Sequence, residues 1–290
     1  MTNVNSILAI MVSIILGALM ALIGSQNSIM LNGYPLFAVC ASIGFLLHWI
    51  MFLPAYIYQT EHYFDLTGSI SYLTVTIFAI INKPEQDFRA ILLCLLITFW
   101  AIRLGSFLLS RVKRDGKDNR FTIMKTKFWW FLMTWTIGGL WVLMTMAAAL
   151  AAITSDLTLP LGEIAYIGLL LWIIGFSIEI IADKQKTLFR SKIENKDLFI
   201  SHGLWKWSRH PNYLGEIILW FGIALIAYPV LSDWQLMTLI SPIFVYILLT
   251  RVSGINILEG RANKKWGNNP EYIRYKELTP VLFPINKLSK

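Results

Sequence analysis

Charged residues are scarce in this chain of 290 residues, because Asp, Glu, Lys and Arg together make up only 14% of it. A soluble protein carries about 25% charged and about 45–50% apolar residues. This chain is 56% hydrophobic, with a mean hydropathy of +0.60. That much apolar surface cannot be buried in one water-soluble fold of this length. The composition therefore excludes a cytosolic enzyme and a disordered protein, and it indicates a protein of the lipid bilayer.

Cysteine and the common catalytic motifs are also lacking. Cys40 and Cys94 are the only cysteines, and each lies in an apolar run, which excludes a disulfide scaffold and a thiolate metal set. The histidines are scattered and no HExxH motif occurs, so no metal site is expected. The chain has no GxGxxG, Walker or GxSxG motif, which excludes a classical Rossmann site, a P-loop and a nucleophile elbow.

Long apolar runs predict an all-α, polytopic membrane bundle of seven or eight transmembrane helices, because a helical span needs about 20 mostly apolar residues. The number stays open because Leu66–Ile81 is short and Tyr213–Tyr228 could begin as a tilted or re-entrant segment. No cleavable signal peptide is expected, since the N-terminus lacks a basic region. The expected spans are Ile7–Ser25, Leu36–Tyr58, Leu66–Ile81, Phe88–Leu109, Phe128–Ile153, Leu161–Ala182, Tyr213–Tyr228 and Trp234–Thr250.

Basic residues account for the net charge of +8, and they gather in segments 111–127, 183–210 and the tail after 251. The positive-inside rule explains this pattern better than a nucleic-acid partner does. We expect these segments and both termini to be cytoplasmic, in a bacterial inner membrane or an endoplasmic-reticulum-type membrane. We further expect an N-terminal helix and loop over residues 1–35 and one membrane domain over residues 36–290.

The densest polar stretch precedes one of these spans, from Ser208 to Glu216. Pro211 suits the first turn of a helix, and in such a helix Asn212 and Glu216 lie four residues apart on one face. A carboxylate one turn inside a membrane helix is costly without a partner. A polar pocket is therefore favoured over the alternative, an interfacial Glu paired with an arginine of a loop.

Two other groups of charges lie at span ends. Glu179 and Asp183 are again four residues apart and precede Arg190. The carboxylates could accept hydrogen bonds from ribose or amide groups while Arg190 binds phosphate, or all three could simply end the span. Arg103 interrupts an apolar run before Arg111, where it either snorkels to the interface or lines a polyanion site.

Several motifs, in a fixed order from about Tyr58 to the C-terminus, resemble the steroid 5-alpha-reductase C-terminal domain superfamily and, within it, the DUF1295 branch. The broader likeness rests on Gly203–Glu216, on Asp183 and Arg190 before it, and on Arg251-Val-Ser-Gly after it. The narrower likeness rests on Phe64–Ser69, Arg103-Leu-Gly, Gly116–Phe121, Glu179–Asp183 and Leu258–Arg261.

The resemblance implies a helical membrane reductase that binds NADPH in a cavity open to the cytosol. Its substrate would be a lipid or steroid-like molecule with a carbon–carbon double bond activated by a carbonyl. The residues that the resemblance and the charge pattern assign to the cofactor are Arg103, Arg111, Arg114, Glu179, Asp183, Arg190, Asn212, Tyr213, Glu216, Arg251, Glu259 and Arg261. Glu61 matches the acid that helps to polarise the carbonyl, and Tyr63 and Asp65 complete the predicted catalytic set.

The chain departs from the resemblance at Trp100, because the steroid reductases carry a tyrosine three residues before the arginine matched by Arg103. Tryptophan has no phenolic proton, which argues against a steroid enone; Tyr63, Asp65 or another tyrosine could take over the role. We hypothesise hydride transfer to the β-carbon of an α,β-unsaturated carbonyl while a protonated Glu61 donates a hydrogen bond to the developing enolate oxygen.

Two alternatives stay open. Membrane methyltransferases that act on isoprenylcysteine or phospholipid with S-adenosylmethionine have a similar Arg-His-Pro turn, an acid pair and a Tyr-x-x-Tyr sequence. Here Arg209–Pro211 and Tyr272–Tyr275 match, but Gly260 stands where a second acid would follow Glu259. The other alternative is a non-catalytic lipid-binding relative.

Overall fold

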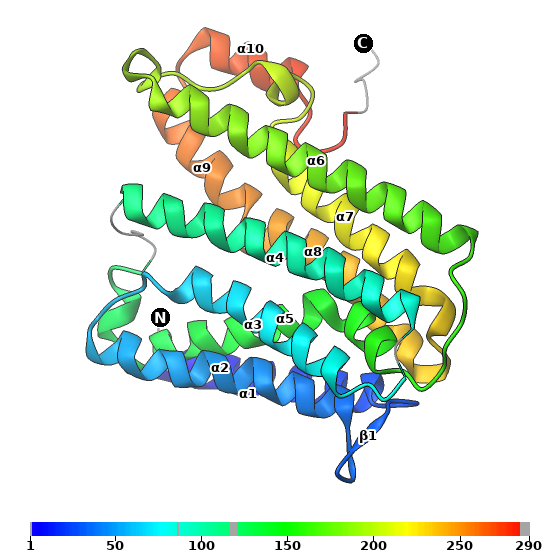
Figure 1. Ribbon diagram of the computed structural model, residues 1–290. Coiled ribbons are helices and arrows are strands. Elements are labelled where there is room, and N and C mark those ends of the chain that lie inside the picture. Colours follow the sequence, from blue (N-terminus) through cyan, green and yellow to red (C-terminus); the bar gives the residue numbers. More distant parts are fainter. Residues whose placement is uncertain (1, 86, 116–120, 285–290) are drawn as a thin grey trace. The chain divides into compact units, whose positions relative to one another are not determined.

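A computed structural model of the protein describes residues 2–85, 87–115 and 121–284, with the backbone alone for residues 113–115. Within these residues, eight helical segments are long and apolar enough to cross a membrane. The chain is therefore a multi-pass integral membrane protein, and the predicted all-α polytopic bundle is confirmed with eight candidate spans (Figure 1).

The described part of the chain consists mainly of α-helices. They are α1 Asn3–Gly24, α2 Leu36–Ile57, α3 Phe64–Ile81, α4 Phe88–Asp115, α5 Phe128–Thr154, α6 Glu163–Ser191, α7 Pro211–Ala227, α8 Ser241–Ile247, α9 Ile255–Trp266 and α10 Pro270–Leu278. A hairpin of β1 (Met30–Leu31) and β2 (Tyr34–Pro35) follows α1. Its turn residues, Asn32 and Gly33, have φ angles of 49° and 84°, as tight hairpin turns require.

The chain forms two compact units. Unit 1 comprises residues 1–165 and 226–241, and unit 2 comprises residues 166–225 and 242–290. The expected division into residues 1–35 and 36–290 stays a prediction.

In unit 1, α5 is the central helix, and α1, α2, α3 and α4 all pack against it. Its small residues are fully or almost fully buried at Ala147, Ala148, Ala149, Ala151 and Ala152. Small residues also let α1 and α2 approach each other: the ring of Phe45 lies against Gly17, and the ring of Phe37 lies against Gly24. The helices of unit 1 therefore pack through small residues, as membrane helices commonly do.

In unit 2, glycines bring α6 and α7 into backbone contact. A Cβ atom added at Gly215 would lie 2.5 Å from the carbonyl oxygen of Gly175 and 2.7 Å from the amide nitrogen of Glu179. A Cβ atom at Gly222 would meet the carbonyl oxygen of Gly168 at 2.5 Å. This crossing places the backbone of Glu179 directly beside the residue that precedes Glu216.

Several spans differ from their expected bounds. The first helix begins at Asn3 instead of Ile7, and the fourth ends at Asp115 instead of Leu109, because polar residues at a span end can continue a helix. The sixth helix continues to Ser191, beyond the expected end at Ala182, because no glycine or proline interrupts the polar segment that follows. The expected span Trp234–Thr250 consists of a 3₁₀ helix over Asp233–Ile240 (η5), then α8, then a π-helical turn over Leu248–Val252 (η6). Hydropathy locates such a span, but it does not reveal the change of helix type.

Candidate functional site

Three carboxylates are buried on α6 and α7 of unit 2. Glu179, Asp183 and Glu216 expose 3%, 7% and 9% of their surfaces. They lie on the two helices whose backbones meet at Gly175 and Gly215. Glu179 and Glu216 therefore lie close to this crossing. Buried acids in membrane helices mark polar, functional positions. The polar pocket predicted around Asn212 and Glu216 stays a prediction.

The segment after α6 folds back onto the end of that helix. The indole nitrogen of Trp205 donates to the carbonyl oxygen of Ala182 at 3.1 Å, and the amide nitrogen of Leu204 donates to Gln185 Oε1 at 3.0 Å. Gly203 has a φ of +60°, and a Cβ atom there would lie 2.5 Å from the Gln185 side chain. Only glycine suits this turn, which fixes the approach of the chain to α7.

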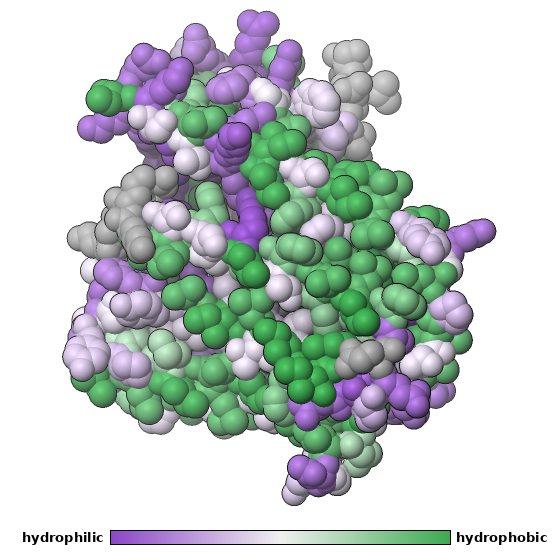
Figure 2. All heavy atoms as spheres, in the orientation of Figure 1, coloured by the Kyte–Doolittle hydropathy of each residue, from purple (hydrophilic) through white to green (hydrophobic). Residues whose placement is uncertain are grey.

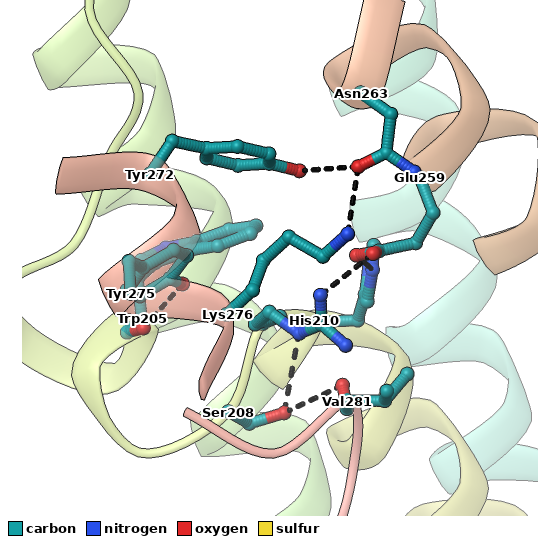
Figure 3. Close-up of polar contacts among 10 residues, drawn as sticks. Trp205, Ser208, His210, Glu259, Asn263, Tyr272, Tyr275, Lys276 and Val281 are labelled. Atoms are coloured by element: carbon teal, nitrogen blue, oxygen red, sulfur yellow. Dashed lines mark hydrogen bonds and ion pairs between the residues drawn. The ribbon is translucent and has the colours of Figure 1, made fainter. Parts of the chain in front are cut away.

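Arg209, His210 and Glu259 form a charged cluster where α7 begins (Figure 3). Arg209 Nη1 lies 2.7 Å from Glu259 Oε2, and His210 Nε2 lies 2.9 Å from Glu259 Oε1. Both carboxylate oxygens of Glu259 are therefore engaged by the chain itself. Burial lowers the pKa of His210, and the hydrogen bond that His210 donates to Glu259 offsets this only in part.

Residues of α9 and α10 enclose this cluster. Tyr275 donates its hydroxyl to the carbonyl oxygen of Trp205 at 2.6 Å. Figure 3 shows the Tyr272 hydroxyl and the Lys276 ammonium converging on the side chain of Asn263, at 3.5 and 2.8 Å. Burial raises the pKa of both tyrosines, so they stay protonated and act as hydrogen-bond donors. On the face seen in Figure 2, hydrophilic residues gather over α9, α10 and the segment after α6.

The other predicted cofactor residues of unit 2 differ in exposure. The side chains of Arg190, Arg251 and Arg261 are exposed, and those of Asn212 and Tyr213 are half-buried. The Tyr213 ring stacks on His210 with centroids 5.8 Å apart and planes 12° apart.

In unit 1, two predicted catalytic residues form ion pairs. Glu61, whose side chain is 3% exposed, has Oε2 at 2.6 Å from Lys125 Nζ. Asp65, in the first turn of α3, has Oδ2 at 3.0 Å from Arg111 Nη2 of α4. The structure thus brings together a predicted catalytic acid and a predicted cofactor arginine. The sequence hypothesis of a protonated Glu61 did not include this lysine partner, and the catalytic role of Glu61 stays a prediction.

Three other residues of unit 1 that the sequence singled out lie on α4. Arg103 lies over the Phe107 ring at 5.3 Å. Trp100 is 1% exposed and packs edge-on against Tyr72, with ring centroids 5.1 Å apart. Tyr72 is therefore a tyrosine in contact with the position at which the chain departs from the steroid reductases. The Arg114 side chain lies outside the described residues.

A family model described as a protein of unknown function, DUF1295, matches residues 51–279, which is most of the chain. The chain belongs to the DUF1295 family. This confirms the DUF1295 resemblance drawn from the motifs. The match begins within α2, so α1 and the hairpin lie outside it. No curated protein and no solved structure matches the chain.

Sequence reasoning missed two contacts in this DUF1295 protein. Lys125 attracted notice only as one of many basic residues, although it pairs with Glu61 from 64 positions away. The sequence likewise did not predict the contact of Lys276 with Asn263, because this contact depends on how α10 packs on α9. Among the residues that the structure describes, no cluster of His, Cys, Asp and Glu suited to a metal ion occurs.

Proposed function

We propose that this DUF1295 protein is a membrane oxidoreductase that transfers hydride from NADPH to an activated carbon–carbon double bond of a lipid or steroid-like enone. The observation that supports it best is the burial of Glu179, Asp183 and Glu216 on α6 and α7. Ionisable residues within membrane helices are rare, usually paired, and commonly mark functional sites, and this supports a polar ligand site between these helices.

The donor and acceptor groups of unit 2 fit a dinucleotide. Buried carboxylates can accept hydrogen bonds from ribose hydroxyls, and the amide of Asn212 can hold a carboxamide or ribose group. Exposed Arg190 can bind phosphate oxygens in a bidentate manner. When bound, NADPH would supply the hydride.

On the substrate side, we assign polarisation of the carbonyl to the Glu61–Lys125 pair. Glu61 Oε2 lies 2.6 Å from Lys125 Nζ, so Glu61 holds the ammonium of Lys125 in position. An ammonium can donate a hydrogen bond to the oxygen on which charge develops. Tyr63 and Asp65 remain the other predicted catalytic residues.

The experiment is a binding titration of the purified full-length protein with NADPH, NADH and S-adenosylmethionine. Arg190→Ala and Asn212→Ala should each raise the dissociation constant for NADPH about tenfold or more. Lys192→Ala is the matched control, because its exposed ammonium lies two positions from Arg190 and pairs only loosely with Glu194, at 3.8 Å. Equal effects of all three variants, or no NADPH binding by the wild type, would contradict the proposal.

A second candidate is a membrane methyltransferase that uses S-adenosylmethionine. One observation favours it: Arg209, His210 and Glu259, which match the methyltransferase pattern, form one cluster. Tyr275 of the same pattern donates to the carbonyl oxygen of Trp205, four positions before Arg209. Binding of S-adenosylmethionine without NADPH in the same titration would select this function. Binding of neither would leave a non-catalytic lipid-binding protein.

A further inference from the structure

A pocket of about 410 Å³ opens at the end of α2 in unit 1. Ligand pockets in proteins commonly have volumes of roughly 300–1,000 Å³. Three of the lining residues recur at helical spacing on one face of α2, a fourth caps the end of that helix, and three follow in the next loop. The lining residues are Met51, Pro54, Ala55, Tyr58, Thr60, His62 and Tyr63.

The loop that closes this pocket has a defined conformation. Gln59 has a φ of 50°, which turns the chain back toward the helix. The Thr60 amide then donates to the carbonyl oxygen of Ala55 at 2.9 Å, and the His62 amide donates to the Thr60 hydroxyl at 3.3 Å. Ala55 is 4% exposed and belongs to the core cluster that contains Phe121. The pocket is therefore a built feature of unit 1.

The lining indicates the chemistry of a ligand. Met51, Pro54 and Ala55 offer an apolar surface, whereas Thr60 and His62 offer hydrogen-bonding groups. The seven lining side chains include no Asp, Glu, Lys or Arg. Glu61, which lies between two lining residues in the sequence, is engaged by Lys125. A charged headgroup would find no counter-ion among the lining residues, so an uncharged oxygen function fits best.

The position of the pocket indicates where the ligand comes from. It lies on the last turns of a helix that is apolar enough to span a membrane. The side chains of Ile50, Leu53 and Ile57 on this helix are 59%, 59% and 71% exposed, as expected for residues that face lipid. Exposed Tyr58 at the helix end fits the headgroup level of a bilayer. A molecule dissolved in the membrane can therefore reach the pocket from the side.

We propose that this pocket binds an uncharged amphiphile taken from the membrane, with its hydroxyl or carbonyl head at Thr60 and His62 and its apolar body along Met51, Pro54 and Ala55. Tyr63, a predicted catalytic residue, lines this pocket, so the inference deepens the proposed function and rests on its substrate side. The labelling experiment below tests lipid binding alone, without NADPH. Failure of lipid binding and failure of the proposed function can therefore be distinguished.

The test is photo-crosslinking of the full-length protein in phosphatidylcholine nanodiscs with a long-chain alcohol that carries a diazirine and an alkyne. Labelling of the peptide that contains residues 51–63 should saturate and should be competed by unlabelled alcohol. Thr60→Trp, which fills the pocket, should raise the half-saturating concentration at least about tenfold. His62→Ala, which leaves the space open but removes a hydrogen-bonding group, should raise it several-fold.

Leu53→Trp is the matched control, because it adds the same bulk to the lipid-facing side of α2 outside the pocket lining. It should leave labelling unchanged. Labelling that rises linearly with probe, or that responds alike to Thr60→Trp and Leu53→Trp, would overturn the proposal. Tighter, saturable labelling by a diazirine phosphatidylcholine than by the alcohol would overturn the assignment of an uncharged head.

Discussion

At the scale of single residues, Glu259 is the acceptor on which the cluster at the start of α7 depends. It accepts from both Arg209 and His210, and the Arg209 side chain is only 11% exposed. In Glu259→Ala, the guanidinium would remain in place without its acceptor, which costs more than the pair itself contributes. We expect the free energy of unfolding to fall by about 2–3 kcal/mol.

Thermal unfolding in detergent measures this effect. Glu277→Ala, on the exposed side of α10, is the control and should change stability by less than about 0.5 kcal/mol. Equal unfolding temperatures for the two variants would show that the contacts of Glu259 contribute little.

The burial of the His210 imidazole leads to a second prediction at this scale, which concerns how stability depends on pH. Its pKa in the folded protein lies below the ordinary value of 6.5, mainly because of burial, so the unfolded chain binds the proton more readily. The contribution of the neutral imidazole to stability is full above pH 6.5 and is lost as the pH falls through the lower, folded pKa.

Between about pH 7.5 and about pH 5.5, wild-type protein should therefore lose more stability than His210→Gln. Unfolding curves at a series of pH values measure the difference. His202→Gln, which changes an exposed histidine, should follow the wild-type curve. A wild-type profile that runs parallel to that of His210→Gln would contradict the lowered pKa.

At the scale of elements, the crossing of α6 and α7 depends on glycine. Gly215→Ala would place a methyl group 2.5 Å from the backbone oxygen of Gly175, and backbone cannot move aside as a flexible side chain can. We expect a loss of stability of about 1–3 kcal/mol. Gly260→Ala in α9 should instead raise stability, because nothing lies within 4 Å of the added Cβ atom and alanine favours a helix by about 1 kcal/mol.

Both variants can be compared in one thermal unfolding experiment. The opposite signs form the prediction, and two losses of similar size would refute the close crossing. Because Glu179 lies at this crossing, Gly215→Ala should also lower the affinity for any ligand that the buried acids bind.

The sequence sufficed to predict most elements, because a membrane helix is specified by its own apolar run. The bounds of α2 and α3 agree with the expected spans to within two residues. The end of α6 was missed because hydropathy reports where lipid contact ends, whereas the helix itself continues through polar residues to Ser191. The π turn at Leu248–Val252 was missed because helix type depends on local hydrogen bonding.

Partnerships within the candidate site were harder to predict than its members. The i, i+4 pairs Glu179 and Asp183, and Asn212 and Glu216, could be read from spacing alone. The pairing of Glu61 with Lys125 and of Glu259 with Arg209 joins residues 64 and 50 positions apart. Such contacts depend on tertiary packing, to which a single sequence gives no direct access.

At the scale of the whole molecule, the distribution of charge predicts which ends of the spans face the cytoplasm. Cys40 and Cys94 are both buried, so we expect little labelling of the native cysteines by a maleimide. We expect a membrane-impermeant maleimide to label Asn32→Cys, in the hairpin, in intact cells. It should label Ile193→Cys, which replaces a side chain that is 91% exposed, only after permeabilisation.

The reverse pattern would place the basic segments outside and would overturn the positive-inside assignment. Labelling of both variants in intact cells would show that the two positions share one side, which contradicts the predicted arrangement of spans.

The central proposal of hydride transfer to a lipid is tested most directly with NADPH that carries deuterium at the transferable position. Purified protein is incubated with this NADPH and with lipids extracted from the host membrane, and the lipids are then analysed by mass spectrometry. The proposal predicts a lipid that loses a double bond and gains deuterium only when the protein is present, with the gain reduced in Arg190→Ala. No deuterated lipid in any extract, together with methyl transfer from labelled S-adenosylmethionine, would contradict it.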